Sequence, residues 1–149
     1  MKLLFRPWVN TSIVILLLRI ILGIVFIAHG GQKVLGWFGG RGLAATVDMF
    51  VNNMHIPAVL AYMDAFTEFL GGILVLIGLL TRISSAGIAV VMIVAIARVH
   101  APNGFFNPAG YEFPLTLLVI AVVLFLYGSG RYGIDYFWES RTRQSGITY

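Results

Sequence analysis

Two pairs of titratable side chains in this sequence have a spacing that could support acid–base chemistry. His29 and Lys33 are four residues apart, and so are Asp64 and Glu68. Residues at this spacing share one face of a helix. Both pairs stand in or at the end of apolar segments, where a charged side chain costs about 2.5–3.5 kcal/mol even on a lenient insertion scale. They therefore predict a polar site inside a membrane.

The first pair also has a simpler interpretation at the membrane surface. Lys33 could extend toward lipid headgroups while His29 bonds a loop carbonyl. Trp37 and Phe38, which follow closely, could belong to the aromatic belt found at such boundaries. Taken alone, this stretch favours the interfacial interpretation, so the case for a site depends on the rest of the chain.

The composition is that of a membrane protein. Of 149 residues, 59% are hydrophobic and only 11% charged, against about 25% charged in soluble domains. The net charge of +4 comes from basic residues near the ends of apolar segments, which indicates membrane topology rather than nucleic-acid binding. The chain has no cysteine, so it cannot itself carry a disulfide, thiol chemistry or an iron–sulfur cluster.

The apolar segments predict an all-α integral membrane protein, a four-helix bundle within a single domain of residues 1–138. The first segment contains Arg19 and lacks a cleavage site, so it is a membrane helix rather than a signal peptide. Between the first two spans, Leu43, Val47, Phe50, Val51 and Met54 share one face, opposite Thr46, Asp48, Asn52 and Asn53; this predicts a short amphipathic surface helix. The expected spans are 12–32, 57–80, 83–99 and 113–127, and residues 139–149 are expected to form a mobile cytoplasmic tail.

Four spans place both termini on one side of the bilayer. That side would carry six basic residues, namely Lys2, Arg6, Arg82, Arg131, Arg141 and Arg143. Because loops rich in lysine and arginine stay in the cytoplasm, both termini are predicted to be cytoplasmic in a multi-pass protein.

Helical rise places several polar groups at one depth. Measured from the cytoplasmic edge, Glu68 lies about 18 Å, Arg98 about 22 Å, Asp64 about 24 Å and His29 about 26 Å along its helix. We therefore predict a pocket in the outer half of the bundle, with His29, Glu68 and Asp64 as the proton-transferring catalytic groups. The substrate-binding residues would be Lys33, Arg98, His100, Glu112, Trp37 and Tyr111, and the aromatic roof would include Phe38 and Phe105.

Other uses of these groups stay open. The charges could form an ion-pair network that only holds the helices in register, with Arg19 as a structural ion pair and Glu68 within reach of Arg98 or Arg19. A metal held by the two carboxylates and two histidines, or a haem between His29 and His100, is chemically conceivable. No haem motif is present, and we expect neither a haem nor a metal.

Several short motifs, taken together in order, resemble the DoxX family of small four-span membrane proteins. The resemblance covers residues 13–137. Its elements are Arg19-x3-Gly23, His29-Gly30-x-x-Lys33, Gly36-Trp37-Phe38-Gly39-Gly40, Glu68-x-x-Gly71-Gly72, Gly78-Leu79-x-Thr81-Arg82, His100, Glu112-Phe113 and Gly128-x-Gly130-Arg131-Tyr132-x-x-Asp135. The positions that carry over as typical of the family are Arg19, His29, Lys33, Glu68, His100 and Glu112. Asp64 lies outside the motifs and rests on the depth argument alone.

The resemblance implies a four-helix bundle in a prokaryotic plasma membrane. The DoxX family takes its name from a membrane part of a thiosulfate:quinone oxidoreductase, and other members are membrane partners of soluble redox or sulfur-transfer enzymes. The resemblance and the polar pocket together predict a membrane subunit of a redox system, possessing a quinone or quinol site and an oxidoreductase or sulfur-transfer partner. The alternatives are a non-catalytic scaffold and, less favoured because no inverted repeat is seen, a small-solute carrier. A homo-oligomer stays open.

Overall fold

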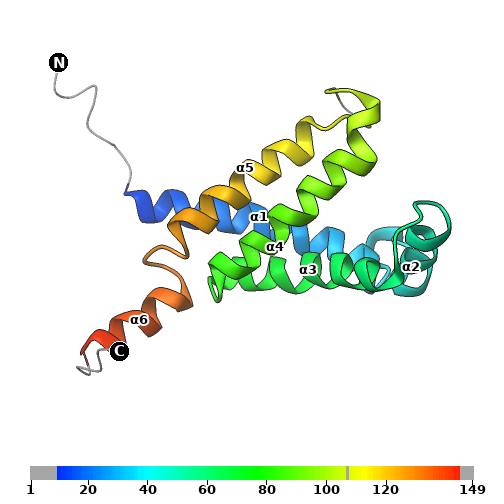
Figure 1. Cartoon of the computed structure of the whole chain (residues 1–149). Coiled ribbons are helices and arrows are strands. Elements are labelled where there is room, and N and C mark those ends of the chain that lie inside the picture. The colour runs from blue at the N-terminus through cyan, green and yellow to red at the C-terminus, as the bar shows by residue number, and fades with distance from the viewer. Residues whose placement is uncertain (1–9, 107, 145–149) are drawn as a thin grey trace, which may run out of the picture.

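The computed structural model describes residues 10–106 and 108–144, and within them every regular element is helical. Long helices α1 (Thr11–Val34), α3 (Ala58–Ile77), α4 (Thr81–Ala95) and α5 (Glu112–Tyr127) form the bundle. Shorter helices α2 (Gly42–Asn52) and α6 (Ile134–Gln144) lie at its opposite ends (Figure 1). We call the end that carries α2 and the α4–α5 connection the loop end, and the end that carries Thr11 and α6 the terminal end.

The predicted membrane bundle is confirmed. Three helical stretches are long and apolar enough to cross a bilayer: α1 with 24 residues, α3 with 20, and α4 with its continuation to Asn103, 23 residues in all. The fourth, α5, is equally apolar but has 16 residues, about 24 Å by helical rise. It runs back beside α4 and completes the bundle.

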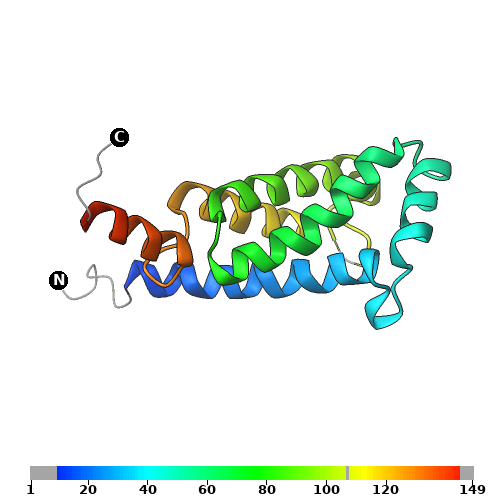
Figure 2. The same ribbon diagram turned by 90° about the horizontal axis from the view of Figure 1, so that it is seen from below.

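The helices pack mainly as two pairs, α1 with α3 and α4 with α5. All four share one long axis in Figure 2, whereas in Figure 1 the second pair diverges from the first toward the loop end. Glycines bring α1 and α3 together: a Cβ on Gly72 would lie 2.7 Å from the backbone nitrogen of Ile27, and one on Gly30 would overlap Phe69. Such small residues let membrane helices approach closely.

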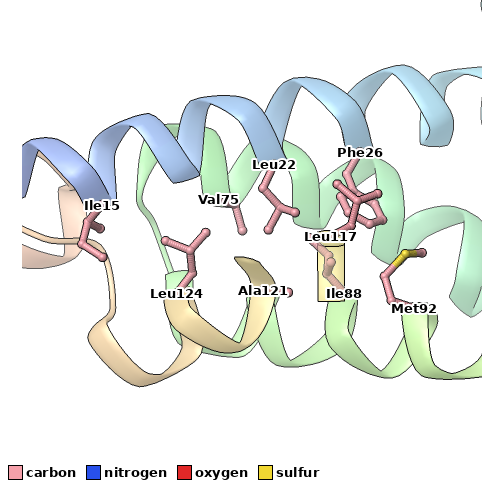
Figure 3. Packing of buried hydrophobic residues seen from close by; sticks show 9 residues of the cluster. All are labelled: Ile15, Leu22, Phe26, Val75, Ile88, Met92, Leu117, Ala121 and Leu124. Carbon is pink, nitrogen blue, oxygen red and sulfur yellow. The ribbon is translucent and has the colours of Figure 1, made fainter. Parts of the chain in front are cut away.

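The apolar core joins the two pairs along the bundle (Figure 3). It consists of buried side chains from α1, α3, α4 and α5, namely Ile15, Leu22, Phe26, Val75, Ile88, Met92, Leu117, Ala121 and Leu124. The core ends near Phe26, Met92 and Leu117, and the polar groups of the loop end lie beyond it.

Arg19 is buried at the terminal end, where it bonds to backbone. Its Nε donates to Val75 O at 3.0 Å, Nη1 to Ser129 O at 2.8 Å and Nη2 to Leu76 O at 2.9 Å. The last carbonyls of a helix lack partners within it, so the C-terminal turn of α3 offers ready acceptors. Arg19 is thus structural, but the hydrogen-bond partners of its guanidinium in the described part of the chain are backbone carbonyls rather than a carboxylate. Arg19 also lies far along α1 from Lys33.

Asp135 fixes the neighbouring connection at the terminal end. Its carboxylate accepts hydrogen bonds from the backbone of Leu80 (2.7 Å) and Thr81 (2.9 Å) at the start of α4, and its own backbone nitrogen donates to Gly78 O at 2.9 Å. A carboxylate at this position satisfies donors that the first turn of a helix leaves free. Through these hydrogen bonds the segment after α5 stabilises the conformation of the α3–α4 turn.

Two predicted boundaries differ from the structure. The third span continues beyond residue 99 through a π-helical segment, Ile96–His100, and a 3-10 turn, Ala101–Asn103. Pro102 fits there because proline is tolerated at the start of a helical turn. Helix α6 runs across the predicted domain boundary at residue 138, so the expected mobile tail is helical as far as Gln144; residues 145–149 lie outside the described part of the chain.

The predicted surface helix is present as α2, but its packed face differs from the prediction. Thr46, predicted to face water, is only 2% exposed, and its hydroxyl donates to Lys33 O at 3.3 Å. Val51, predicted to lie on the apolar face toward the bilayer, is 37% exposed, which is compatible with lipid contact. Helix α2 packs across α1 and α3, so tertiary contact with α1 rather than amphipathic periodicity decides which side chains it buries.

Candidate functional site

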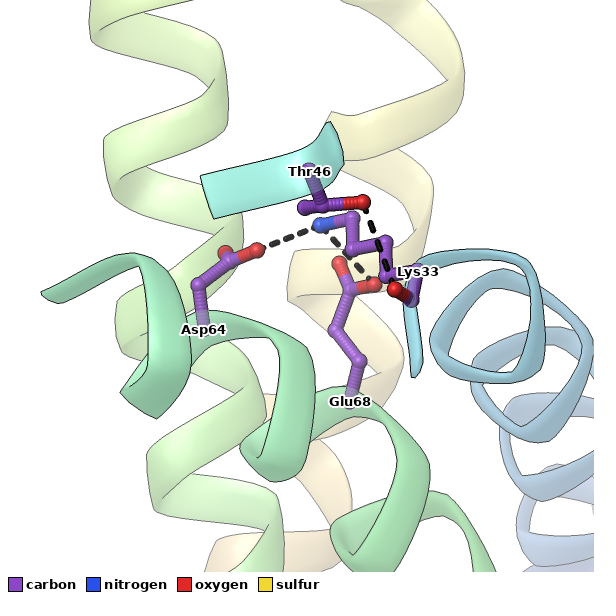
Figure 4. A network of polar contacts seen from close by, with 4 residues as sticks. All are labelled: Lys33, Thr46, Asp64 and Glu68. Carbon is purple, nitrogen blue, oxygen red and sulfur yellow. Dashed lines mark hydrogen bonds and ion pairs between the residues drawn. The ribbon is translucent and has the colours of Figure 1, made fainter. Parts of the chain in front are cut away.

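Lys33 lies between two carboxylates at the loop end. Its Nζ is 2.5 Å from Asp64 Oδ2 and 2.9 Å from Glu68 Oε2 (Figure 4). Lys33 comes from the last turns of α1, and both acids come from one face of α3. We call these three residues the Lys33 triad.

The triad corrects the predicted partner of Glu68. Its carboxylate faces the bundle interior as expected, with the residue 4% exposed, but the cation beside it is Lys33 rather than Arg98 or Arg19. The close α1–α3 packing places Lys33 next to α3.

The contact at Glu68 is an ion pair without an aligned hydrogen bond. Within the described residues, the buried Oε2 atom accepts no hydrogen bond of good geometry, whereas Lys33 donates a well-formed one to Asp64. Buried carboxylate oxygens usually have such partners. Glu68 Oε2 is therefore an acceptor that a bound hydroxyl group can use.

Helix α2 contacts Lys33 through two side chains, Thr46 and Phe50. The Thr46 hydroxyl bonds the Lys33 carbonyl, and Lys33 Nζ stands 5.7 Å from the centre of the Phe50 ring. A cation over an aromatic face is attracted by the ring quadrupole. A movement of α2 would therefore change the surroundings of the ammonium group directly.

A cavity of about 320 Å³ opens beside the triad, which is within the range of small-molecule sites. We call it the polar cavity. Six of the seven predicted titratable residues line it, namely His29, Lys33, Asp64, Glu68, Arg98 and His100. Its apolar wall comes from α1, α4 with the π-helical segment, and α5, namely Phe26, Met92, Val94, Ala95, Val99, Phe113, Pro114 and Leu117.

The remaining predicted site residues lie elsewhere. Glu112, Trp37, Phe38, Phe105 and Tyr111 are not part of the cavity lining. The Trp37 ring packs edge-on against Phe69, with centroids 5.7 Å apart, and the Phe105 ring packs against Tyr111 at 5.3 Å. The loop aromatics thus pack against one another and against Phe69 of α3.

The actual roof of the cavity is Met49, Phe50, Met54 and Ile56, from α2 and the segment after it. Sequence reasoning did not assign these residues to the site. Phe50 and Met54 did stand on the apolar face predicted for residues 43–54, so the signal was present. It was interpreted as contact with the bilayer rather than with the bundle.

The π-helical segment presents two further cationic or titratable groups. Arg98 lies in it and lines the cavity from the α4 side, and His100 ends it. His100 Nδ1 is 2.9 Å from Ala109 O, and since a carbonyl oxygen only accepts, Nδ1 is the donor in this contact. The wider π turns are frequent at functional sites, because they change the direction in which side chains leave a helix.

The triad does not have the form of a metal site. Lys33 Nζ occupies the space between the two carboxylates where a cation would bind. In the part of the chain that the structure describes, no three His, Cys, Asp or Glu side chains come together in a metal-binding arrangement.

Comparison with known proteins identifies the chain. The family model of DoxX matches residues 14–101, more than half its length. The chain belongs to the DoxX family. The matched DoxX region extends from α1 through the π-helical segment and contains all six titratable residues of the polar cavity.

Three relatives cover most of this DoxX protein. A Bacillus subtilis protein named "Putative oxidoreductase CatD" is 37% identical over 82% of this chain and 84% of its own. A Haemophilus influenzae protein is 28% identical over 85% and 84%, and a Mycobacterium tuberculosis membrane protein is 29% identical over 81% and 78%. No solved structure matches the chain.

Proposed function

We propose that this DoxX protein is the membrane subunit of a redox system and binds the head of a quinone or quinol in the polar cavity. The observation that carries the proposal is the cavity itself, in which a partly buried acid–base triad faces an apolar wall. Flat, weakly polar rings suit such a wall, and a few polar groups then fix their orientation. The name of the Bacillus subtilis relative supports a redox role.

The triad matches the chemistry of the quinone couple. Reduction of a quinone adds two electrons and two protons, so its site needs donors for the ring oxygens and groups that exchange protons. Lys33 and Arg98 are the donors toward quinone oxygens. Glu68 accepts a hydroxyl proton of a quinol, and Asp64 and His29 pass protons onward. The two electrons go to or come from a partner oxidoreductase, soluble or membrane-bound, since we assign no electron carrier to this chain.

A non-catalytic scaffold is the competing function, and one observation favours it. Lys33 already pairs with both carboxylates and so ties α1 to α3. A scaffold, however, needs no cavity beside its ion pairs. Nor does it use Arg98, which is exposed at the cavity rim and makes no ion pair with the triad in the described part of the chain.

Binding of a short-tailed quinone to the purified protein in lipid nanodiscs tests the proposal. We expect saturable binding to the parent, weakened about tenfold or more in Glu68→Gln and His29→Ala, which corresponds to about 1.4 kcal/mol. Asp48→Asn on the exposed side of α2 removes a carboxylate away from the cavity and should bind like the parent. Absence of binding in the parent, with stability lost in the Glu68 variant, would establish the scaffold instead.

We further propose that the bundle lies in the plasma membrane with the terminal end in the cytoplasm. Arg82 at the start of α4, Arg131 between α5 and α6, and Arg141 in α6 lie at that end, in agreement with the positive-inside rule. Because the chain has no cysteine, single-cysteine variants give clean labels. In intact cells a membrane-impermeant maleimide should label Asn53→Cys and should reach Ser140→Cys only after permeabilisation. The reverse pattern would invert the orientation.

A further inference from the structure

A second hollow runs along the outside of the bundle between α3 and α4. This α3–α4 groove has a volume of about 710 Å³ and is open to the surroundings of the helices. It shares five lining residues with the polar cavity, namely Phe50, Ile56, Asp64, Val94 and Arg98. The groove and the cavity are therefore adjacent, with Asp64 and Arg98 at the boundary between them.

The walls of the groove are apolar and face the bilayer. Leu60 and Met63 on α3 are 50% and 59% exposed, and Val90 and Ile93 on α4 are 60% and 54% exposed. These residues lie along the part of the bundle that a membrane must surround. Only the end of the groove at the cavity carries charge, from Asp64 and Arg98.

The groove extends from the cavity toward the middle of the helices. Along α4 and the π-helical segment its lining runs from Arg98 back to Gly87, eleven residues away, which is about 16 Å by helical rise. At the far end of the groove α3 and α4 lie close together, since a Cβ on Gly87 would be only 3.0 Å from Thr67 Cγ2. The hollow is thus an open groove, charged at one end and mainly apolar along the rest.

We infer that the α3–α4 groove holds the apolar tail of a membrane-dissolved quinone, which enters from the side, between α3 and α4, and passes its head between Asp64 and Arg98 into the polar cavity. This inference rests on the proposed function and adds the class of ligand and its route: a lipid-soluble molecule with a long tail, taken from the bilayer rather than from water. A small water-soluble substrate would leave the apolar groove without a use.

Photolabelling in nanodiscs tests the route. The probe is a quinone whose isoprenoid tail carries a diazirine, and labelled positions are read by mass spectrometry. We expect label on Leu60, Met63, Val90 and Ile93, and displacement of that label by excess short-tailed quinone. Leu17 and Ile24 of α1 are equally exposed to lipid, at 56% each, and serve as the internal control, with no displacement.

A blocking variant separates the tail site from the head site. Ala97 is exposed and lines the groove but not the cavity, so Ala97→Leu should fold normally and reduce groove labelling about threefold or more, because many small packing contacts of the tail are lost together. Its affinity for the short-tailed quinone should stay at the parent value. Gly87→Leu at the far end provides a second block, and Ala45→Leu on the exposed side of α2 is the matched control.

The outcomes distinguish the two proposals. Groove labelling that short-tailed quinone does not displace, or that Ala97→Leu and Gly87→Leu leave unchanged, would overturn the lateral route while the head site stands. Label spread evenly over α1 and the groove would do the same and would indicate ordinary lipid contact. Failure of the parent to bind even the short-tailed quinone would overturn the proposed function and this inference with it.

Discussion

The Lys33 triad makes a quantitative prediction about stability. Lys33→Met keeps the length of the side chain but leaves two carboxylates facing each other at the loop end. Loss of one partner from a buried ion pair costs about 3–5 kcal/mol. The Lys33 and Asp64 side chains are 26% and 18% exposed, whereas the Glu68 side chain is 5% exposed. Asp64 therefore keeps contact with solvent when the lysine is removed. The loss in the free energy of unfolding should then lie near 3 kcal/mol, about the lower limit of that range.

Glu68→Gln should cost less, about 1 kcal/mol, for a structural reason. The ion pair at Oε2 has no aligned hydrogen bond to lose, the amide oxygen can still accept from Lys33, and Asp64 still neutralises the ammonium group. In the double variant Lys33→Met/Glu68→Gln, only one carboxylate is left without its cation. The two changes should therefore be non-additive, by about 1 kcal/mol or more.

Equilibrium unfolding in mixed detergent micelles measures these differences as a double-mutant cycle. Asp48→Asn, on the exposed side of α2, is the reference and should change the free energy of unfolding by less than about 0.5 kcal/mol. If Lys33→Met were as stable as this reference, or if the two triad changes were strictly additive, the triad would not be a coupled buried unit and the reasoning above would fail.

Three further predictions concern the packing that positions the triad. Arg19→Met should destabilise by about 3–5 kcal/mol in the same unfolding assay, because three carbonyl oxygens lose their donors at once; stability like that of the parent would contradict the clamp. Asp135→Ala should cost about 1 kcal/mol and speed hydrogen exchange in the first turn of α4, with Asp135→Asn retaining part of the cap. Gly30→Leu should separate α1 from α3, because its side chain would overlap Phe69, and should abolish quinone binding and most of the folded yield; a normally folded variant would show that the helix contact is adjustable.

The sequence was sufficient to predict the spans and the level of the site. Apolar length gave the four helices of the bundle, and helical rise brought six titratable residues to one cavity. The same reasoning gave Glu68 the wrong partner. The rise along a helix gives the depth of a side chain, but it does not show which helix lies beside that side chain. The close glycine contacts between α1 and α3 place Lys33, rather than Arg98, next to Glu68.

The roof of the cavity was not predictable for a related reason. Loop aromatics at the right depth were natural candidates, but Trp37 packs on Phe69 and Phe105 on Tyr111. Helix α2 covers the site instead, anchored by the Thr46 bond to Lys33. An amphipathic period shows that one face is apolar, but it does not show whether lipid or protein covers that face.

The two ends of the bundle treat their polar groups differently, and this contrast bears on function. At the terminal end, the Arg19 guanidinium and the Asp135 carboxylate are matched with backbone partners, as a purely structural role requires. At the loop end, Glu68 Oε2 lacks an aligned hydrogen bond, and Arg98 and His29 line a cavity instead of closing it. If every charge served only to hold helices in register, both ends should be satisfied alike. Two neutral hydroxyls near the terminal end, Thr81 Oγ1 and Ser85 Oγ, also lack hydrogen-bond partners among the described residues. The Glu68 carboxylate, by contrast, is a charged group that lies beside the polar cavity, where a ligand would complete its hydrogen bonding.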